Sequence, residues 1–146
     1  MHLAGARCLD LFAGSGALGF EALSRGARET VFVDTDPESI RHVVEMLQTL
    51  KCDRGRAVRM DASSYLGQPA EPFDLVFLDP PFADRALANL CARLESAGWL
   101  KPGAYVYLES PATEGEPPLP EGWTLLRSKR AGEVGYHLAR RQQNVE

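Results

Sequence analysis

Short apolar runs that do not alternate with polar residues recur along this chain. Most of them are followed by a segment whose apolar residues recur at the spacing of a helix. The strongest run is FDLVFL at 73–78, and ETVFVD at 29–34 is of the same kind. A strand that is apolar at consecutive positions is buried on both faces, which is typical of a parallel sheet covered by helices. We therefore expect an α/β, doubly wound (Rossmann-like) fold with a mostly parallel sheet and helices on both faces.

The expected elements occupy almost the whole chain without an internal boundary. Strands are predicted at 7–12, 29–34, 56–60, 73–78, 104–109, 123–130 and 133–140. Helices are predicted at 16–26, from Pro37 onward, at 63–66 and from 84 to about 98. The last two strands flank Ala131 and Gly132 and form a C-terminal antiparallel hairpin in a seven-stranded sheet. Because 146 residues build one core but not two, we expect a single domain over 1–146.

Composition argues against several classes of protein. Hydrophobic content of 45% and charged content of 25% are ordinary for a soluble globular chain. No apolar run reaches the length of a membrane span, and the N-terminal residues lack the pattern of a signal peptide. The cysteines Cys8, Cys52 and Cys91 are widely spaced, which predicts free thiols in a reducing compartment and no metal centre. We expect a cytoplasmic monomer that binds neither membrane nor metal.

A glycine-rich loop follows the first predicted strand. Gly14, Gly16 and Gly19 form the pattern G-x-G-x-x-G between that strand and the next helix. Glycines in this position let a ligand approach the backbone N–H groups at a helix N-terminus. Asp34 lies 20 residues after Gly14, at the end of the second strand, where a carboxylate can accept both hydroxyls of a ribose. The loop predicts a cofactor that contains adenosine, and this much fits NAD as well as S-adenosylmethionine.

Other acids near the loop help to separate the two cofactors. Asp10 precedes the loop, and its carboxylate would repel a pyrophosphate but attract the ammonium and sulfonium of S-adenosylmethionine. The alternative for Asp10 is to fix the loop or cap the helix. Asp61, followed by Ala62, could accept an adenine amino group or cap the short helix that follows. Asp36 precedes Pro37 and is better explained as a helix N-cap.

The most apolar strand ends in the sequence Asp79-Pro80-Pro81-Phe82. Each proline fixes its own φ and pushes the preceding residue toward extended geometry, so the backbone carbonyl of Pro80 is rigidly directed. A carboxylate and a carbonyl held side by side can accept both N–H bonds of one exocyclic base amine, and Phe82 can stack on the base. Holding the amine in this way favours a tetrahedral nitrogen, which predicts methyl transfer to nitrogen.

Basic residues concentrate near the C-terminus of a chain whose net charge is −4. Between 127 and 141 a single acid, Glu133, accompanies five basic residues: Arg127, Lys129, Arg130, Arg140 and Arg141. Such a cluster either contacts RNA phosphates or forms the solvated edge of a hairpin. Both interpretations stay open at this point.

The chain resembles the RsmD-type 16S rRNA (guanine-N2)-methyltransferase family, within the class I S-adenosylmethionine-dependent amino-methyltransferases. The resemblance is carried by LDLFAGSGALGFEALSRGA (9–27), FDLVFLDPPF (73–82), GWLKPGAYVYLES (98–110) and KRAGEVGYHLARR (129–141). It implies methylation at guanine 966 of 16S rRNA, naked or in an assembling small ribosomal subunit, with S-adenosyl-L-methionine as cofactor. The candidate cofactor-binding residues are Asp10, Phe12, Gly14, Gly16, Gly19, Asp34, Asp61 and Ala62, and the candidate catalytic residues are Asp79, Pro80, Pro81 and Phe82.

Members of this family carry an N-terminal extension before the first strand, whereas the glycine loop begins here at residue 14. RNA affinity and turnover depend in part on that extension, so a chain that binds cofactor without turnover is one alternative. A second is an adenine-N6 methyltransferase on DNA or RNA, because Asp-Pro-Pro-Phe also serves that reaction. A third is an NAD-dependent oxidoreductase, which would use the glycine loop and Asp34 but not Asp79.

Overall fold

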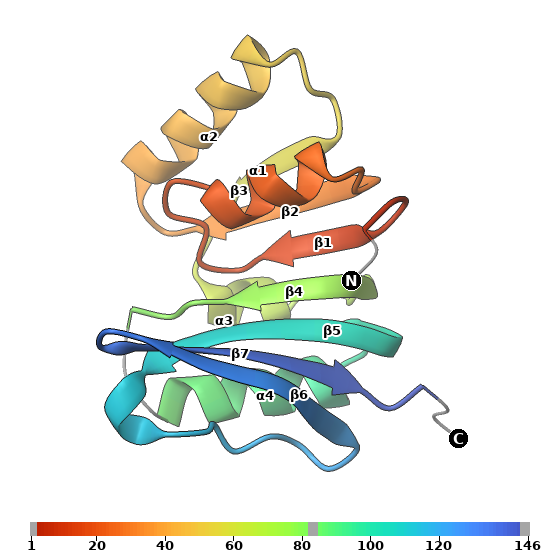
Figure 1. Cartoon of the computed structure of the whole chain (residues 1–146). Coiled ribbons are helices and arrows are strands. Elements are labelled where there is room, and N and C mark those ends of the chain that lie inside the picture. Colours follow the sequence, from red (N-terminus) through yellow and green to blue (C-terminus); the bar gives the residue numbers. More distant parts are fainter. Residues whose placement is uncertain (1–2, 82–84, 144–146) are drawn as a thin grey trace.

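The computed structural model describes residues 3–81 and 85–143, and these form one seven-stranded sheet flanked by helices (Figure 1). The strands are β1 (Arg7–Asp10), β2 (Glu29–Asp34), β3 (Gly55–Arg59), β4 (Phe73–Leu78), β5 (Leu100–Pro111), β6 (Trp123–Ala131) and β7 (Val134–Arg141). The helices are α1 (Ala17–Ser24), α2 (Pro37–Thr49), α3 (Ala62–Leu66) and α4 (Arg85–Ser96), with a 3₁₀ turn η1 (Ala112–Glu114).

The strand order is β3-β2-β1-β4-β5-β7-β6. Strands β1 to β5 are all parallel, and β7 is antiparallel to both β5 and β6. The predicted doubly wound sheet with its C-terminal antiparallel hairpin is therefore confirmed. From the middle of the sheet, β1, β2 and β3 follow one another toward one edge, and β4 and β5 follow one another toward the other edge. The order thus reverses between β1 and β4, and this is the point at which such sheets bind ligands, outside the carboxyl ends of the strands.

Two strands, β1 and β5, differ from the sequence prediction by two or more residues at a boundary, and the other differences are of one residue. Strand β1 ends at Asp10 rather than at residue 12, because Leu11 and Phe12 already turn toward the glycine loop. Strand β5 begins four residues earlier than expected, since Leu100 pairs with Phe73 across an irregularity in the β4–β5 ladder. The expected element types and their order are otherwise observed.

The sheet has a core on each face. Helices α3 and α4 cover one face, where Trp99 packs against Tyr65 and Phe73 and donates its indole N–H to the Leu66 carbonyl at 3.3 Å. Trp99 is 1% exposed, so its replacement by alanine costs about 3–5 kcal/mol of folding free energy. Helices α1 and α2 cover the other face over β1, β2 and β3. These two cores fix the strand ends that carry the candidate site.

The cysteines and the charged groups of the described residues offer no metal centre. Cys8 and Cys91 are buried, which raises the pKa of each thiol to about 12, and Cys52 is half-buried. Within 3–81 and 85–143 there is no group of three or more His, Cys, Asp or Glu residues placed to hold a metal ion. None of the described helices is both long enough and apolar enough to cross a membrane.

Candidate active site

The glycine loop connects β1 to α1 and owes its shape to two left-handed residues. Gly14 has φ of 54° and Gly16 has φ of 82°, and Gly16 is the N-cap of α1. A Cβ on Gly14 would meet nothing within 4 Å, so the space beside this residue is open. Gly19 is required for a different reason, because a Cβ there would lie 2.3 Å from the ring of Phe32 on β2. The third glycine therefore allows α1 to pack closely on the sheet.

Asp34 closes the loop from the end of β2. Its Oδ2 accepts the Gly14 N–H at 2.8 Å, and its Oδ1 accepts the Asp36 N–H at 2.9 Å. Each carboxylate oxygen has two lone pairs, so both retain the capacity to accept a further hydrogen bond. Asp34 is only half-buried and lines the main cavity. The carboxylate is thus rigidly oriented and still available to a pair of hydroxyl groups.

Asp10 lies beneath the loop rather than in the cavity wall. It is 3% exposed, and its Oδ2 accepts the Gly19 N–H at 3.1 Å. Burial raises the pKa of Asp10 to about 7, the Gly19 hydrogen bond opposes that shift, and the charges of Asp79 and Asp34 add to it. Because Gly19 lies in the first turn of α1, the helix-capping role that the sequence left as an alternative is observed. Direct contact between Asp10 and a cofactor stays a prediction.

A cavity of about 970 Å³ opens at the carboxyl ends of β1, β2, β3 and β4. Seven of the candidate residues line it: Phe12, Gly14, Asp34, Asp61, Ala62, Asp79 and Pro81. The sequence did not indicate the remaining lining residues Leu11, Thr35, Met60, Ser63, Asn89, Leu90, Ala92 and Arg93. Thr35 and Met60 adjoin predicted acids in the sequence, whereas the α4 residues carry no signal beyond helical spacing.

Asp61 is the N-cap of α3 as well as part of the cavity wall. Its carboxylate accepts the Ser64 N–H at 3.0 Å and the Ser64 hydroxyl at 2.6 Å, and these hydrogen bonds lower its pKa. Arg93 on α4 donates to the hydroxyl and carbonyl oxygens of Ser63, both at 2.9 Å. Asp36 is the N-cap of α2, as predicted, and accepts from Glu38 and Ser39.

A second cavity of about 670 Å³ lies beside the first, and the end of β4 separates them. Its described lining residues are Asp79, Pro80, Pro81, Glu109, Ser110, Pro111, Thr113, Glu133 and Val134. Asp79 and Pro81 line both cavities, and partial burial raises the pKa of the Asp79 carboxyl. Phe82 lies outside the described residues. The candidate catalytic carboxylate therefore stands between two spaces, one of them beside the glycine loop.

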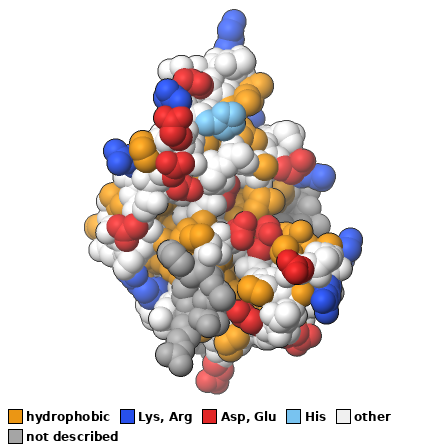
Figure 2. All heavy atoms as spheres, turned by 90° about the vertical axis from the view of Figure 1, so that its left-hand side faces the viewer, with side chains coloured by type: hydrophobic (Ala, Val, Ile, Leu, Met, Phe, Trp, Pro, Cys, Tyr) orange, Lys and Arg blue, Asp and Glu red, His pale blue; other side chains and the backbone are white. Residues whose placement is uncertain are grey.

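Charge is unevenly distributed over the end of the molecule that carries both cavities. Figure 2 shows acidic side chains near the middle of this face as well as at its edge, whereas the Lys and Arg side chains lie mostly toward the edge. The acids near the middle favour a cationic ligand there.

The five basic candidates near the C-terminus do not form one patch. Residues that face each other in an antiparallel pair point to the same side of the sheet, and β6 pairs Arg127 with Leu138 and Lys129 with Tyr136. These four residues line a hollow of about 430 Å³ with Tyr107, on the sheet face opposite α4.

Arg141 points to the other side of the sheet and has partners. It donates to Glu95 at 2.8 Å from both Nε and Nη2, and from Nη1 to the Leu100 carbonyl at 2.9 Å. Arg140 donates to the Gly103 carbonyl at 3.1 Å and lies over the Tyr105 ring. Arg130 donates to the carbonyl of Gly132 in the hairpin turn. An RNA contact by Arg130 and Arg140 stays a prediction, whereas the contacts of Arg141 join β7 to α4 and favour a structural role for that residue.

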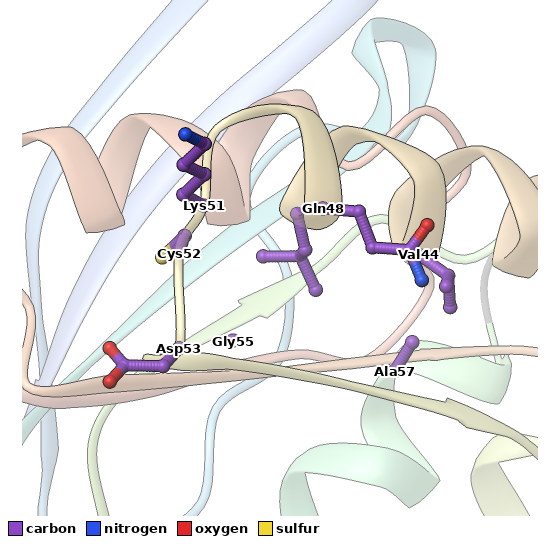
Figure 3. Close-up of a pocket in the computed structure, with 8 residues that line it drawn as sticks. Val44, Gln48, Lys51, Cys52, Asp53, Gly55 and Ala57 are labelled. Carbon is purple, nitrogen blue, oxygen red and sulfur yellow. The ribbon is translucent and has the colours of Figure 1, made fainter.

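A smaller hollow of about 370 Å³ lies between the end of α2 and β3, at the far edge of the sheet (Figure 3). Val44, Gln48 and Ala57 are among the residues that line it. Figure 3 shows that Lys51 and Asp53 point away from the space between helix and strand, whereas the amide of Gln48 lies along it without a charged side chain beside it. We assign no chemistry to this hollow.

The mixed seven-stranded sheet carries a glycine loop and Asp34 at the point where its strand order reverses. The Asp-Pro-Pro sequence lies at the end of the neighbouring strand β4. Together these features define a Rossmann-like methyltransferase. The comparisons with known proteins agree. The chain belongs to the family of ribosomal RNA small subunit methyltransferase D, and a family model described as Conserved hypothetical protein 95 matches residues 1–140. This membership rules out the NAD-dependent oxidoreductase that the glycine loop alone left open.

Two relatives carry this assignment. Ribosomal RNA small subunit methyltransferase D of Escherichia coli K12 is 43% identical over 97% of this chain and 71% of its own length. The Haemophilus influenzae protein of the same name is 47% identical over 90% of this chain and 69% of its own length.

Solved structures agree with the fold. The Escherichia coli protein yhhF superposes with a TM-score of 0.92 at 42% identity, covering 96% of this chain and 79% of that one. TrmN from Thermus thermophilus shares the fold at 23% identity, with a TM-score of 0.73 over 94% of this chain and 44% of that one.

Proposed function

We propose that this chain methylates the exocyclic N2 amine of a guanine in 16S rRNA, with S-adenosyl-L-methionine as the methyl donor. The observation that carries the proposal is the position of Asp79, whose carboxylate lines both the cavity beside the glycine loop and the adjoining cavity. The rRNA substrate is supported by the names of the relatives, and the N2 position by the resemblance of the motifs.

The first cavity fits the chemistry of S-adenosyl-L-methionine. Asp34 offers two oriented oxygens for the ribose hydroxyls, and the open space beside Gly14 admits a ligand against the backbone. Asp61 and Met60 line the part of the cavity that follows β3, where an adenine ring would contact an apolar side chain and a carboxylate. The donor supplies an electrophilic methyl group on a sulfonium, and the acids around this cavity favour such a cation.

Asp79 and the two prolines hold the acceptor amine. The lone pair of an exocyclic base amine is delocalised into the ring, so the nitrogen becomes nucleophilic only when its geometry changes. The Asp79 carboxylate and the Pro80 carbonyl accept the two N–H bonds and favour a tetrahedral nitrogen whose lone pair faces the first cavity. The nitrogen must lose one proton as it gains the methyl group, and Asp79, whose pKa is raised by partial burial, is placed to accept it.

The hollow of about 430 Å³ between β6 and β7 is suited to the RNA that surrounds the target guanine. Tyr107 and Tyr136 provide aromatic faces, and Arg127 and Lys129 provide cations for phosphates. An rRNA substrate also implies that the protein acts in the cytoplasm, and we propose that it does so as a monomer.

The proposal is tested by transfer of a labelled methyl group to 30S subunits and to naked 16S rRNA, both from cells that lack the modification. Nucleoside analysis of the product should give N2-methylguanosine, and the Asp79→Ala variant should form it about 10²-fold more slowly. N6-methyladenosine instead would replace the proposed reaction by the adenine alternative. Binding of S-adenosylhomocysteine without transfer to either substrate would reduce the chain to a cofactor-binding module.

A further inference from the structure

The second cavity is acidic, although it lies beside the site proposed for an RNA base. Among the described residues that line it, the charged ones are Asp79, Glu109 and Glu133, and none is Lys or Arg. Carboxylates repel phosphates and accept hydrogen bonds without donating any. The cavity is therefore suited to the part of a nucleotide that carries N–H donors, which is the edge of its base.

Glu109 is the acid placed next to Asp79. Leu78 of β4 pairs with Leu108 of β5 in a parallel register, so Asp79 and Glu109 follow at the same level on neighbouring strands. Glu109 is half-buried, and burial together with the charge of Asp79 raises its pKa. The Tyr107 hydroxyl, two residues earlier on β5, opposes that rise in the Glu109 pKa. The two acids thus form a pair of acceptors on one wall of the cavity.

Base edges differ in what they present to such a pair. Guanine carries two neighbouring donors, the N2 amine and the N1–H. Adenine carries an amine next to the N1 lone pair, and cytosine carries an amine next to the N3 lone pair. A second carboxylate beside the first gains a hydrogen bond from guanine but faces an acceptor in adenine or cytosine, which is unfavourable.

We propose that Glu109 selects guanine by accepting its N1–H while Asp79 holds the N2 amine. This inference rests on the proposed function and deepens it, because it assigns the choice of base to a residue outside the Asp-Pro-Pro sequence. Glu133 lines the same cavity but is exposed and lies in the hairpin between β6 and β7. It therefore serves as the matched control for the removal of one negative charge.

The test compares guanine with 2-aminopurine at the target position of a ligated 16S rRNA. The analogue keeps the amine that receives the methyl group but lacks the N1 hydrogen and O6. The unmodified enzyme should prefer guanine in kcat/KM by about 10- to 100-fold, the range for a hydrogen bond to a charged group. In Glu109→Gln and Glu109→Ala the preference should fall to within a few fold, mainly through slower reaction with guanine. Any effect of O6 is common to all variants and cancels in the comparison.

The Glu133→Gln control should keep the preference of the unmodified enzyme. Titration with S-adenosylhomocysteine checks that each variant still folds and binds cofactor. A preference that is unchanged in both Glu109 variants, or lost equally in Glu133→Gln, overturns the assignment of Glu109 and leaves the proposed function intact. Failure of the unmodified enzyme to methylate guanine N2 overturns both.

Discussion

Replacement of Asp79 by alanine should abolish most methyl transfer while leaving the fold and the cofactor affinity nearly unchanged. Asp79 is exposed at the end of β4 and contributes nothing to the two buried cores, so its loss does not open a cavity in them. Its hydrogen bond to the amine exists only when the base is present and strengthens as the nitrogen becomes tetrahedral. The effect therefore belongs in kcat rather than in KM.

The size of the effect follows from the position of the carboxylate. Removal of one preorganised polar group from a closed active site costs about 10²–10³ in rate, or about 3–4 kcal/mol. Asp79 is only partly shielded from solvent, so we expect the lower end of this range, near 10²-fold. Asp79→Asn keeps a carbonyl acceptor in the same place and should retain partial activity, above Asp79→Ala and below the unmodified enzyme.

Single-turnover methyl transfer at saturating RNA, over a range of pH, measures these effects. In the proposed mechanism the ionised form of Asp79 is the active one, and burial raises its pKa, so activity should fall as pH decreases through that raised value. The acid limb should disappear in Asp79→Asn. A fully active Asp79→Ala enzyme would refute the amine clamp, and an equal loss of cofactor affinity would make Asp79 a cofactor-binding residue instead.

Three further predictions address the cofactor site, pH and RNA. Asp34→Ala removes the acceptor of two ribose hydroxyls and should weaken binding of S-adenosylhomocysteine by about 1–3 kcal/mol in a calorimetric titration; an unchanged Kd would remove Asp34 from the site. The pKa of Asp10 is raised from 3.8 to about 7 by burial, so its contribution to stability is full below the unfolded-state pKa and is lost as pH rises through about 7. Asp10→Asn should therefore raise the free energy of unfolding at pH 8 by at most about 4 kcal/mol, seen as a higher melting temperature, with little gain at pH 4; equal shifts of the melting temperature at both pH values would contradict this. Neutralising Arg127 and Lys129 together should reduce the slope of log K against log salt for RNA by about 0.7–0.9 per phosphate contact, whereas Arg141→Ala should lower the melting temperature and leave that slope unchanged; the reverse pattern would place the RNA on the other face.

The fold was predictable because the sequence carries its determinants locally. Continuous apolar runs such as 73–78 indicate strands buried on both faces, and Asp36 before Pro37 marks a helix start that the structure contains. The separation of Gly14 and Asp34 in the sequence also predicted two groups that the structure brings to 2.8 Å. These features depend on neighbouring residues or on a motif with a fixed geometry.

Other features of the site depend on which strands become neighbours. Glu109 ends the predicted strand 104–109 much as Asp34 ends another, and its importance follows only from the pairing of β5 with β4. The basic residues look like one cluster in the sequence, but alternation along β7 sends Arg141 to the opposite face from Leu138 and Tyr136. Asn89 and Arg93 enter the cavity because of where α4 lies on the sheet, which helical spacing does not reveal.

The acids that line the second cavity, on the face shown in Figure 2, act as a charge filter on any RNA that docks there. These carboxylates repel the ribose–phosphate chain, so we expect an uncharged base on an extended nucleotide, with its phosphates outside the cavity, to be the part that reaches Asp79. A base stacked within a helix cannot meet that condition while its phosphates remain at the edge. The nucleotide that reacts must therefore be unpaired or turned out of its stack before it is methylated.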